Sequence, residues 1–148
     1  MWGEVGTGKT FAACEVANAL IDKGYPVLVT NFARIANQLQ GTFEKQEYID
    51  RLNRYSLIVL DDLSSERNTE YMNEQIFQIV DARYRAQLPM IITTNLTMSE
   101  LKNPQEIAKR RIYDRVLERC HPIRVSGTNK RKAKIKNDYA DMQKMLGL

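Results

Sequence analysis

Short apolar runs alternate with longer amphipathic stretches along most of the chain. Runs of strand length occur at Pro26–Thr30, Leu57–Leu60, Met90–Thr93 and Ile123–Val125. Between and around them, apolar residues recur at helical spacing at 11–23, 33–39, 48–55, 69–87 and 104–119. Strands that are apolar throughout are buried on both faces, and intervening helices supply the crossovers of a parallel sheet. The pattern therefore predicts an α/β fold in which helices cover both faces of a parallel sheet.

Composition fits one such domain, which we expect to comprise residues 1–148. Hydrophobic residues make up 43% and charged residues 27% of the sequence, as in ordinary globular proteins. No apolar run approaches the roughly 20 residues of a membrane helix. The N-terminus lacks the pattern of a signal peptide, and Cys14 and Cys120 form no disulfide framework. We therefore expect a reduced, cytoplasmic protein with no membrane partner.

The net charge of +4 is unevenly distributed. The segment Lys109–Lys136 holds eleven Lys or Arg residues against two acids, so it carries +9 and the rest of the chain −5. Such a segment commonly contacts a polyanion, and the alternative is a solvated basic face. Residues 132–148 are expected to form a basic amphipathic helix, whose apolar face comprises Ile135, Tyr139, Met142 and Leu146.

One glycine-rich segment matches the phosphate-binding pattern G-x-x-x-x-G-K-[ST] at every fixed position. Its residues are Gly3, Glu4, Val5, Gly6, Thr7, Gly8, Lys9 and Thr10. The glycines allow backbone N–H groups to approach phosphate oxygens at the N-terminus of the helix that follows. We predict that this P-loop binds ATP, with Lys9 bridging the β- and γ-phosphates and the Thr10 hydroxyl ligating Mg²⁺.

Two carboxylates follow the apolar run Leu57–Leu60 directly. A buried strand ends in paired acids at a high desolvation cost unless a cation or water meets them. Asp61 is therefore predicted to hold Mg²⁺, directly or through water. Asp62 is placed to polarise the attacking water, and Glu66, one turn further on, is a less favoured candidate for that role.

The next strand, Met90–Thr93, delivers two polar residues to the same edge of the sheet, because parallel strands all end at one edge. These residues are Thr94 and Asn95. A neutral polar side chain there can position water beside the γ-phosphate. Asn95 is our first candidate and Thr94 the second, and a plain capped turn is the alternative.

Arginines recur on the helix predicted after that strand. Arg111, Arg115 and Arg119 are spaced by four residues and share one face. They form either a solvated face offset by Asp114 and Glu118 or an arginine finger offered to the nucleotide of a neighbouring subunit. A guanidinium suits the second role because it matches the spread charge of a transferring phosphoryl group.

With these motifs in order, the sequence resembles the AAA+ ATPase domain of the DnaC/DnaI helicase loaders, particularly their phage and prophage versions, with the IstB transposition helpers as close relatives. The most specific stretches are L-D-D-L-S-S-E at 60–66, T-E-Y at 69–71, I-T-T-N-L at 92–96 and R-I-Y-D-R at 111–115. The resemblance makes Asn95 the sensor 1 residue, and Arg111 and Arg115 the box VII arginines, one of which would be the finger. Arg131 resembles the sensor 2 arginine, a role for which Arg124 competes.

The resemblance implies a three-layer αβα P-loop NTPase fold of the AAA+ type. Its parallel sheet would include a central strand before the P-loop, between Met90–Thr93 and Ile123–Val125. That strand is missing from this sequence, in which the P-loop starts at Gly3. The domain is therefore expected to be partial at its N-terminus.

The function implied is that of a weakly hydrolysing ATPase that loads a replicative hexameric helicase onto single-stranded DNA at the initiation of replication. Self-association would place an arginine finger in trans. The basic tail and residues 32–34, with Phe32 stacking on a base, would contact DNA. An ATPase that assists a transposase, as in IstB, and a non-hydrolysing adaptor remain the alternatives.

Overall fold

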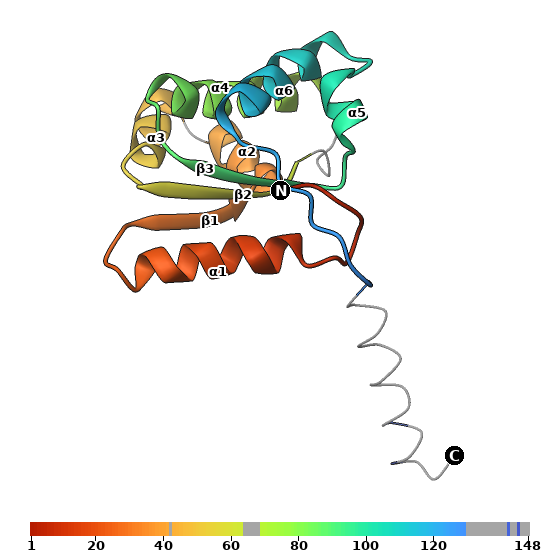
Figure 1. Cartoon of the computed structure of the whole chain (residues 1–148). Coiled ribbons are helices and arrows are strands. Elements are labelled where there is room, and N and C mark those ends of the chain that lie inside the picture. The colour runs from red at the N-terminus through yellow and green to blue at the C-terminus, as the bar shows by residue number, and fades with distance from the viewer. Residues whose placement is uncertain (42, 64–68, 130–141, 143–144, 146–148) are drawn as a thin grey trace.

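The computed structural model describes residues 1–41, 43–63, 69–129, 142 and 145. Its centre is a three-stranded sheet of β1 (Val27–Asn31), β2 (Leu57–Leu63) and β3 (Met90–Thr94), in the order β1-β2-β3 (Figure 1). Both strand pairs are parallel. The predicted parallel α/β sheet is therefore confirmed, and all three strands end at the same edge.

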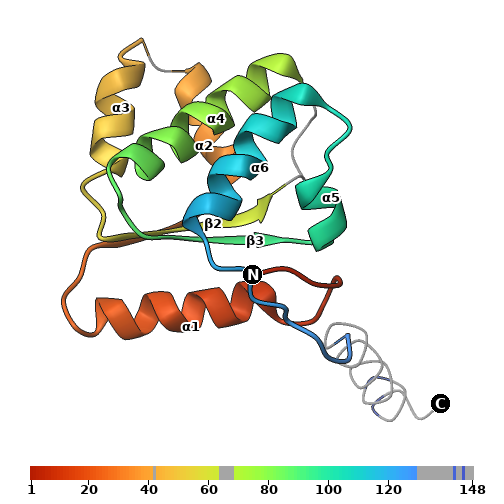
Figure 2. The same cartoon turned by 45° about the horizontal axis from the view of Figure 1, so that its top comes forward.

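Helices cover both faces of this sheet. On one face, α1 (Lys9–Ile21) packs across all three strands. The helices of the other face are α2 (Phe32–Gln40), α4 (Glu70–Arg85) and α6 (Ile107–Arg119), with the shorter α3 (Lys45–Leu52) and α5 (Met98–Lys102) beside them. Figure 2 shows the resulting three layers, with α1 on one side of the sheet and α2, α4 and α6 on the other.

The apolar run of β2 is continuous because the strand is buried on both faces. Leu57 and Val59 point to the α1 side, where they pack against Ala13 and Ala17 of that helix. Ile58 and Leu60 alternate with them and join the larger core, which α2, α4 and α6 complete. Successive strand residues point to opposite faces, so one run of four apolar residues serves two cores.

The expected helix over 104–119 is wrong at its start. The structure places a short helix, α5, at Met98–Lys102, and α6 begins only at Ile107. A capping box fixes α5, because Thr97 accepts the Glu100 backbone N–H while the Glu100 side chain accepts the Thr97 N–H. The T-x-x-E signature at 97–100 predicts such a start, and Pro104 lies in the turn between the two helices.

The first two residues extend the sheet beyond β3. Trp2 forms parallel bridges to both Thr94 and Arg124. The backbone N–H of Thr94 donates to the Met1 carbonyl at 3.1 Å, and that of Val125 donates to the Trp2 carbonyl at 2.8 Å. Residues 1–2 thus lie between β3 and residues 123–125, where the resemblance placed a central strand. The predicted strand at 123–125 takes part only through the bridge at Arg124.

Three sequence-based expectations fall outside this description. Glu66, Arg131 and most of the expected helix at 132–148 lie outside the described residues. Among the helices that are described, none has both the length and the apolar composition needed to cross a membrane.

A buried arginine connects the loops at the amino ends of β2 and β3. Arg83 of α4 is 0% exposed, and its guanidinium donates to the carbonyls of Tyr55 at 2.9 Å, Pro89 at 2.5 Å and Leu52 at 3.4 Å. Burial lowers the pKa of Arg83 to about 10, so the side chain stays charged at neutral pH. Among the described residues, the partners of this charge are backbone carbonyls. They lie at the edge of the sheet where β2 and β3 begin, opposite the edge where the strands end.

Replacing this guanidinium should weaken the fold substantially. Arg83→Met keeps most of the side-chain volume but leaves buried carbonyls without donors, so we expect a loss of about 3 kcal/mol in the free energy of unfolding. Urea denaturation measures it. The control is Arg85→Met on the same helix, whose side chain is 77% exposed and pairs with Asp81; it should cost less than about 1 kcal/mol. Equal losses in the two variants would contradict the structural role of Arg83.

Candidate functional site

The P-loop at residues 3–10 lies at the edge where the three strands end. Its conformation requires glycine at two points. Gly8 precedes α1 with φ of 97°, and a Cβ on Gly3, which has φ of 150°, would lie 2.2 Å from the Val125 carbonyl oxygen. Helix α1 then begins at Lys9 with the backbone N–H groups of its first turn lacking partners within the helix. Such a helix start favours an anion.

A cavity of about 430 Å³ separates the loop from the ends of β2 and β3. Its walls are Val5, Gly6, Gly8, Lys9, Thr10 and Phe11 on the side of the loop and α1, and Asp61, Asp62, Thr93 and Asn95 on the side of the sheet. Asp61, Asp62 and Asn95 were expected here from the sequence, and the structure brings them together with Lys9 and Thr10. The cavity combines the loop of an anion site with two carboxylates.

Lys9 reaches across this cavity. Its side chain is largely buried, and its ammonium group donates to the carbonyls of Gly3 at 2.9 Å and Glu4 at 2.7 Å and to Asn95 Oδ1 at 2.8 Å. These acceptors hold the charge between the loop and the end of β3. A phosphate entering the loop would offer the same ammonium stronger, charged acceptors.

The two residues expected to ligate Mg²⁺ are in direct contact. The Thr10 hydroxyl donates to Asp61 Oδ1 at 2.8 Å. One hydroxyl and one carboxylate suit Mg²⁺, which retains several waters and takes its remaining ligands from substrate phosphates. Among the described residues there is no group of three or more His, Cys, Asp or Glu side chains able to hold a metal. The donor set therefore fits a magnesium ion brought with a nucleotide rather than a metal bound by protein alone.

Asp62 adopts a conformation that is unusual for a residue with a side chain. Its φ is 63°, and it lies in an irregularity of the β2–β3 pairing, where three steps along β2 from Leu60 to Leu63 match two steps from Ile92 to Thr94. Asn95 Nδ2 donates to Asp62 Oδ1 at 3.3 Å. The bulge thus orients the Asp62 side chain toward Asn95, the residue expected to position the same water molecule.

Sequence reasoning missed Thr93. Its hydroxyl donates to Asp61 Oδ1 at 2.6 Å and accepts the backbone N–H of Asp62 at 2.9 Å. A hydroxyl directly after the apolar run Met90–Ile92 was the available signal, because a polar atom buried there needs partners. Thr94, the second candidate for positioning water, instead bonds to the Leu63 carbonyl with its hydroxyl.

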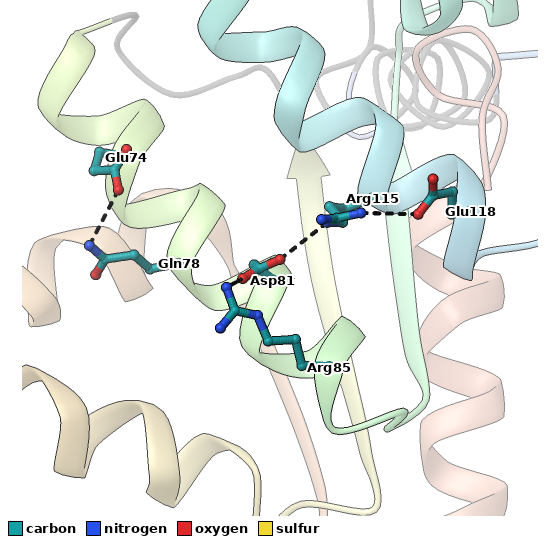
Figure 3. Close-up of polar contacts among 6 residues, drawn as sticks. All are labelled: Glu74, Gln78, Asp81, Arg85, Arg115 and Glu118. Atoms are coloured by element: carbon teal, nitrogen blue, oxygen red, sulfur yellow. Dashed lines mark hydrogen bonds and ion pairs between the residues drawn. The ribbon is translucent and has the colours of Figure 1, made fainter.

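The arginines of α6 lie elsewhere and pack on α4, as Figure 3 shows for Arg115. Arg115 Nε contacts Asp81 Oδ1 at 3.1 Å, its Nη1 contacts Glu118 Oε2 at 3.2 Å, and its guanidinium stacks 4.4 Å from the Tyr84 ring centre. Asp81 also binds Arg85 at 2.5 Å. Arg115 is therefore held within its own subunit by an ion-pair network.

Two further arginines of this helix also face α4. Arg111 stacks 4.0 Å from the Phe77 ring centre, and Arg119 donates to the Gln87 carbonyl. The spacing by four that suggested a shared face is correct, and that face meets α4. Neither Arg111 nor Arg115 lines the cavity beside the P-loop of its own chain.

Arg124 lies nearer the loop than these arginines. Its guanidinium stacks 5.4 Å from the Trp2 ring centre, and it lines a second cavity of about 330 Å³. Gly3, Glu4 and Asn95 share that cavity, so it adjoins the first. Arg131, the competing candidate for the sensor 2 role, lies outside the described residues.

The expected DNA contact through Phe32 is wrong. Phe32 is 1% exposed and belongs to the larger core, so its ring is not available to stack on a base. The physical reason is that the residue starts α2 directly after β1, where the chain turns over the sheet. Arg34, two residues further along the helix, is exposed.

Comparison with known proteins identifies a matching family and several relatives. The family model described as IstB-like ATP binding protein matches residues 1–138. The replicative helicase loader DnaI of Bacillus subtilis is 26% identical over 144 residues, which cover 88% of this chain and 46% of DnaI. The replicative helicase loader DnaC of Escherichia coli K12 is 29% identical over 119 residues, covering 77% of this chain and 47% of DnaC.

Solved structures give the same result for the fold. The crystal structure of the DnaC helicase loader superposes with a TM-score of 0.71 and 25% sequence identity, over 84% of this chain and 76% of that one. The fold is thus the AAA+-type α/β fold expected from the motifs. The chain spans about half the length of the curated relatives it matches.

Proposed function

Since this chain belongs to the family of IstB-like ATP binding proteins, we propose that it binds and hydrolyses ATP with Mg²⁺. We further propose that it acts as a cytoplasmic helicase loader in the initiation of DNA replication. The observation that carries this proposal is the convergence of Lys9, Thr10, Asp61 and Asn95 on one cavity at the end of the sheet. A P-loop lysine, a metal-binding hydroxyl and carboxylate, and a polar residue facing the lysine are the parts that nucleotide hydrolysis requires.

Each residue has a separate task in this proposal. The loop amides and Lys9 bind the β- and γ-phosphates and neutralise their charge. Thr10 and Asp61 would hold Mg²⁺, which would help to neutralise the charge of the phosphates. Asp62 accepts a hydrogen bond from the attacking water, and Asn95, already in contact with Asp62 and Lys9, orients that water toward the γ-phosphate.

Helicase and DNA are the proposed partners, because DnaI and DnaC are replicative helicase loaders. Single-stranded DNA would contact the basic segment 109–136. Within its described part, Lys109 pairs with Glu106 and Arg115 with Asp81, so these two cations are already neutralised. The proposed DNA contact therefore draws on the remaining cations of the segment, including those at 130–136, which lie outside the described residues.

The family match itself favours a second candidate, an ATPase that assists a transposase. Both candidates require the same nucleotide site, so the chemistry of the cavity does not separate them. A helicase or primosome gene beside the coding sequence would favour the loader, and a transposase gene would favour the transposition helper. A chain that binds no nucleotide would be an adaptor instead.

Two substitutions should separate binding from hydrolysis. Lys9→Ala removes the cation that meets ground-state phosphates, so tight ATP binding should be lost. Asp62→Asn changes only the group that acts on water, so we expect ATP affinity within about threefold of the original chain and turnover lowered by about a hundredfold or more. Fluorescent-nucleotide titration and phosphate release measure the two quantities. Equal loss of binding in both variants would contradict these roles.

Completion of the site by a neighbouring copy is the remaining part of the proposal. Arg111 and Arg115 lie on α6, away from their own P-loop cavity, and either is a candidate finger for the cavity of the next subunit. Arg115 would have to exchange Asp81 and Glu118 for the γ-phosphate. Of its contacts with the described residues, Arg111 would give up the ring of Phe77.

Mixing experiments identify the finger. Lys9→Ala lacks a nucleotide site but keeps both arginines, while Arg111→Ala and Arg115→Ala each keep the site. An arginine finger contributes on the order of a thousandfold or more in hydrolysis rate. The variant that lacks the finger arginine should therefore be inactive alone and should release phosphate again when it is mixed with Lys9→Ala. Activity should rise with total protein concentration. If neither arginine variant recovers activity although each still assembles with Lys9→Ala, neither Arg111 nor Arg115 is the finger.

A further inference from the structure

The end of β2 contains one residue more than the strand beside it. Leu60 pairs with Ile92 and Leu63 with Thr94, so Asp61 and Asp62 together oppose the single residue Thr93. A bulge of this kind redirects side chains, and bulges are frequent beside active sites. Here the bulge allows two successive carboxylates to contact different residues. Asp61 accepts a hydrogen bond from Thr10, and Asp62 accepts one from Asn95.

The hydroxyl of Thr93 is the group that meets both halves of this bulge. Its oxygen accepts the Asp62 backbone N–H, which can only donate, so its single proton is directed to Asp61 Oδ1. The O···O distance of 2.6 Å is typical of a hydroxyl bonded to a charged carboxylate. Thr93 is 2% exposed, so water does not substitute readily for either bond.

Asp62 has a conformational cost that these bonds offset. A non-glycine residue at φ of 63° is strained by about 1–2 kcal/mol relative to the right-handed or extended regions. Without the acceptor on Thr93, the Asp62 N–H would lose this bond. One restraint on the strained backbone of Asp62 would then be gone, and its carboxylate would be held less firmly beside Asn95.

From this geometry we propose that Thr93 is a positioning residue, whose hydroxyl fixes Asp61 toward the metal and Asp62 toward the water. The inference rests on the proposed function, because it assigns Thr93 to the Mg²⁺ and water steps of that ATPase. It adds a group that acts through the two acids, by its hydrogen bonds to the Asp61 carboxylate and the Asp62 backbone. Groups that orient a metal ligand typically change metal affinity by about 10–100-fold when they are removed.

Three variants isolate the hydroxyl. Thr93→Val keeps the branched shape without the oxygen, Thr93→Ser keeps the oxygen without the methyl group, and Thr30→Val removes a buried hydroxyl from β1 as a control for the sheet. Circular dichroism and urea denaturation verify that each is folded. The probe is a fluorescent ATP analogue titrated at a series of free Mg²⁺ concentrations, and again in EDTA.

We expect Thr93→Val to raise the Mg²⁺ concentration at half-maximal binding by about tenfold or more, with unchanged affinity in EDTA. Thr93→Ser and Thr30→Val should stay within about threefold of the original chain. An unchanged Mg²⁺ midpoint in folded Thr93→Val would overturn the proposal. So would an equal shift in Thr93→Ser, because the methyl group and its packing would then be the cause.

A second readout needs no nucleotide. The backbone amide of Asp62 donates to the Thr93 hydroxyl, so its hydrogen-exchange rate reports on that bond. Measured by NMR in the free protein, the rate should be at least about tenfold higher in Thr93→Val than in Thr93→Ser. If the original chain binds no nucleotide but this difference is observed, the proposed ATPase function fails while Thr93 is still shown to hold the bulge. Equal exchange in the two variants shows that Thr93 does not hold it, whether or not ATP binds.

Discussion

The carboxylate of Asp61 is the point at which three elements of the fold are joined. Its Oδ1 atom accepts from Thr10 at the start of α1 and from Thr93 at the end of β3, while its backbone belongs to β2. The helix on one face of the sheet and two neighbouring strands therefore meet at one oxygen atom. The P-loop is positioned against the sheet by this contact and by the bonds of Lys9 to Asn95 and to its own loop.

This arrangement follows from the parallel sheet. Strands that run in one direction bring their last residues to one edge, and the apolar runs behind them are buried between α1 and the helices of the other face. Polar groups are concentrated where those runs stop. A bulge then gives two adjacent acids separate partners, at the cost of a strained backbone at Asp62. The buried sheet holds these polar groups in fixed positions, and its edge is where the nucleotide is proposed to bind.

Much of this was predictable because it depends on local patterns. The P-loop motif, the apolar run before Asp61 and the polar end of β3 each occupy a few consecutive residues, and parallel topology brings them together. The role of Thr93 was not predictable in the same way, since it arises from a one-residue mismatch between two strands. Nor was the pairing of Arg115 with Asp81, 34 positions away, because helix spacing gives a face but not the helix that it meets. Phe32 was misjudged for a different reason, since an aromatic residue that starts a helix directly after a strand is buried where the chain turns over the sheet.

The central claim is that the loop at residues 3–10 and the strand ends beside it hold the phosphates of a nucleotide. The most direct measurement is an NMR titration of the ¹⁵N-labelled chain with MgATP. The account predicts large shifts for the backbone amides of Gly6, Gly8, Lys9 and Thr10 and for the side-chain amide of Asn95, as Lys9 exchanges loop carbonyls for phosphate. Absence of shifts at millimolar MgATP, or shifts confined to the cavity beside Arg124, would contradict it.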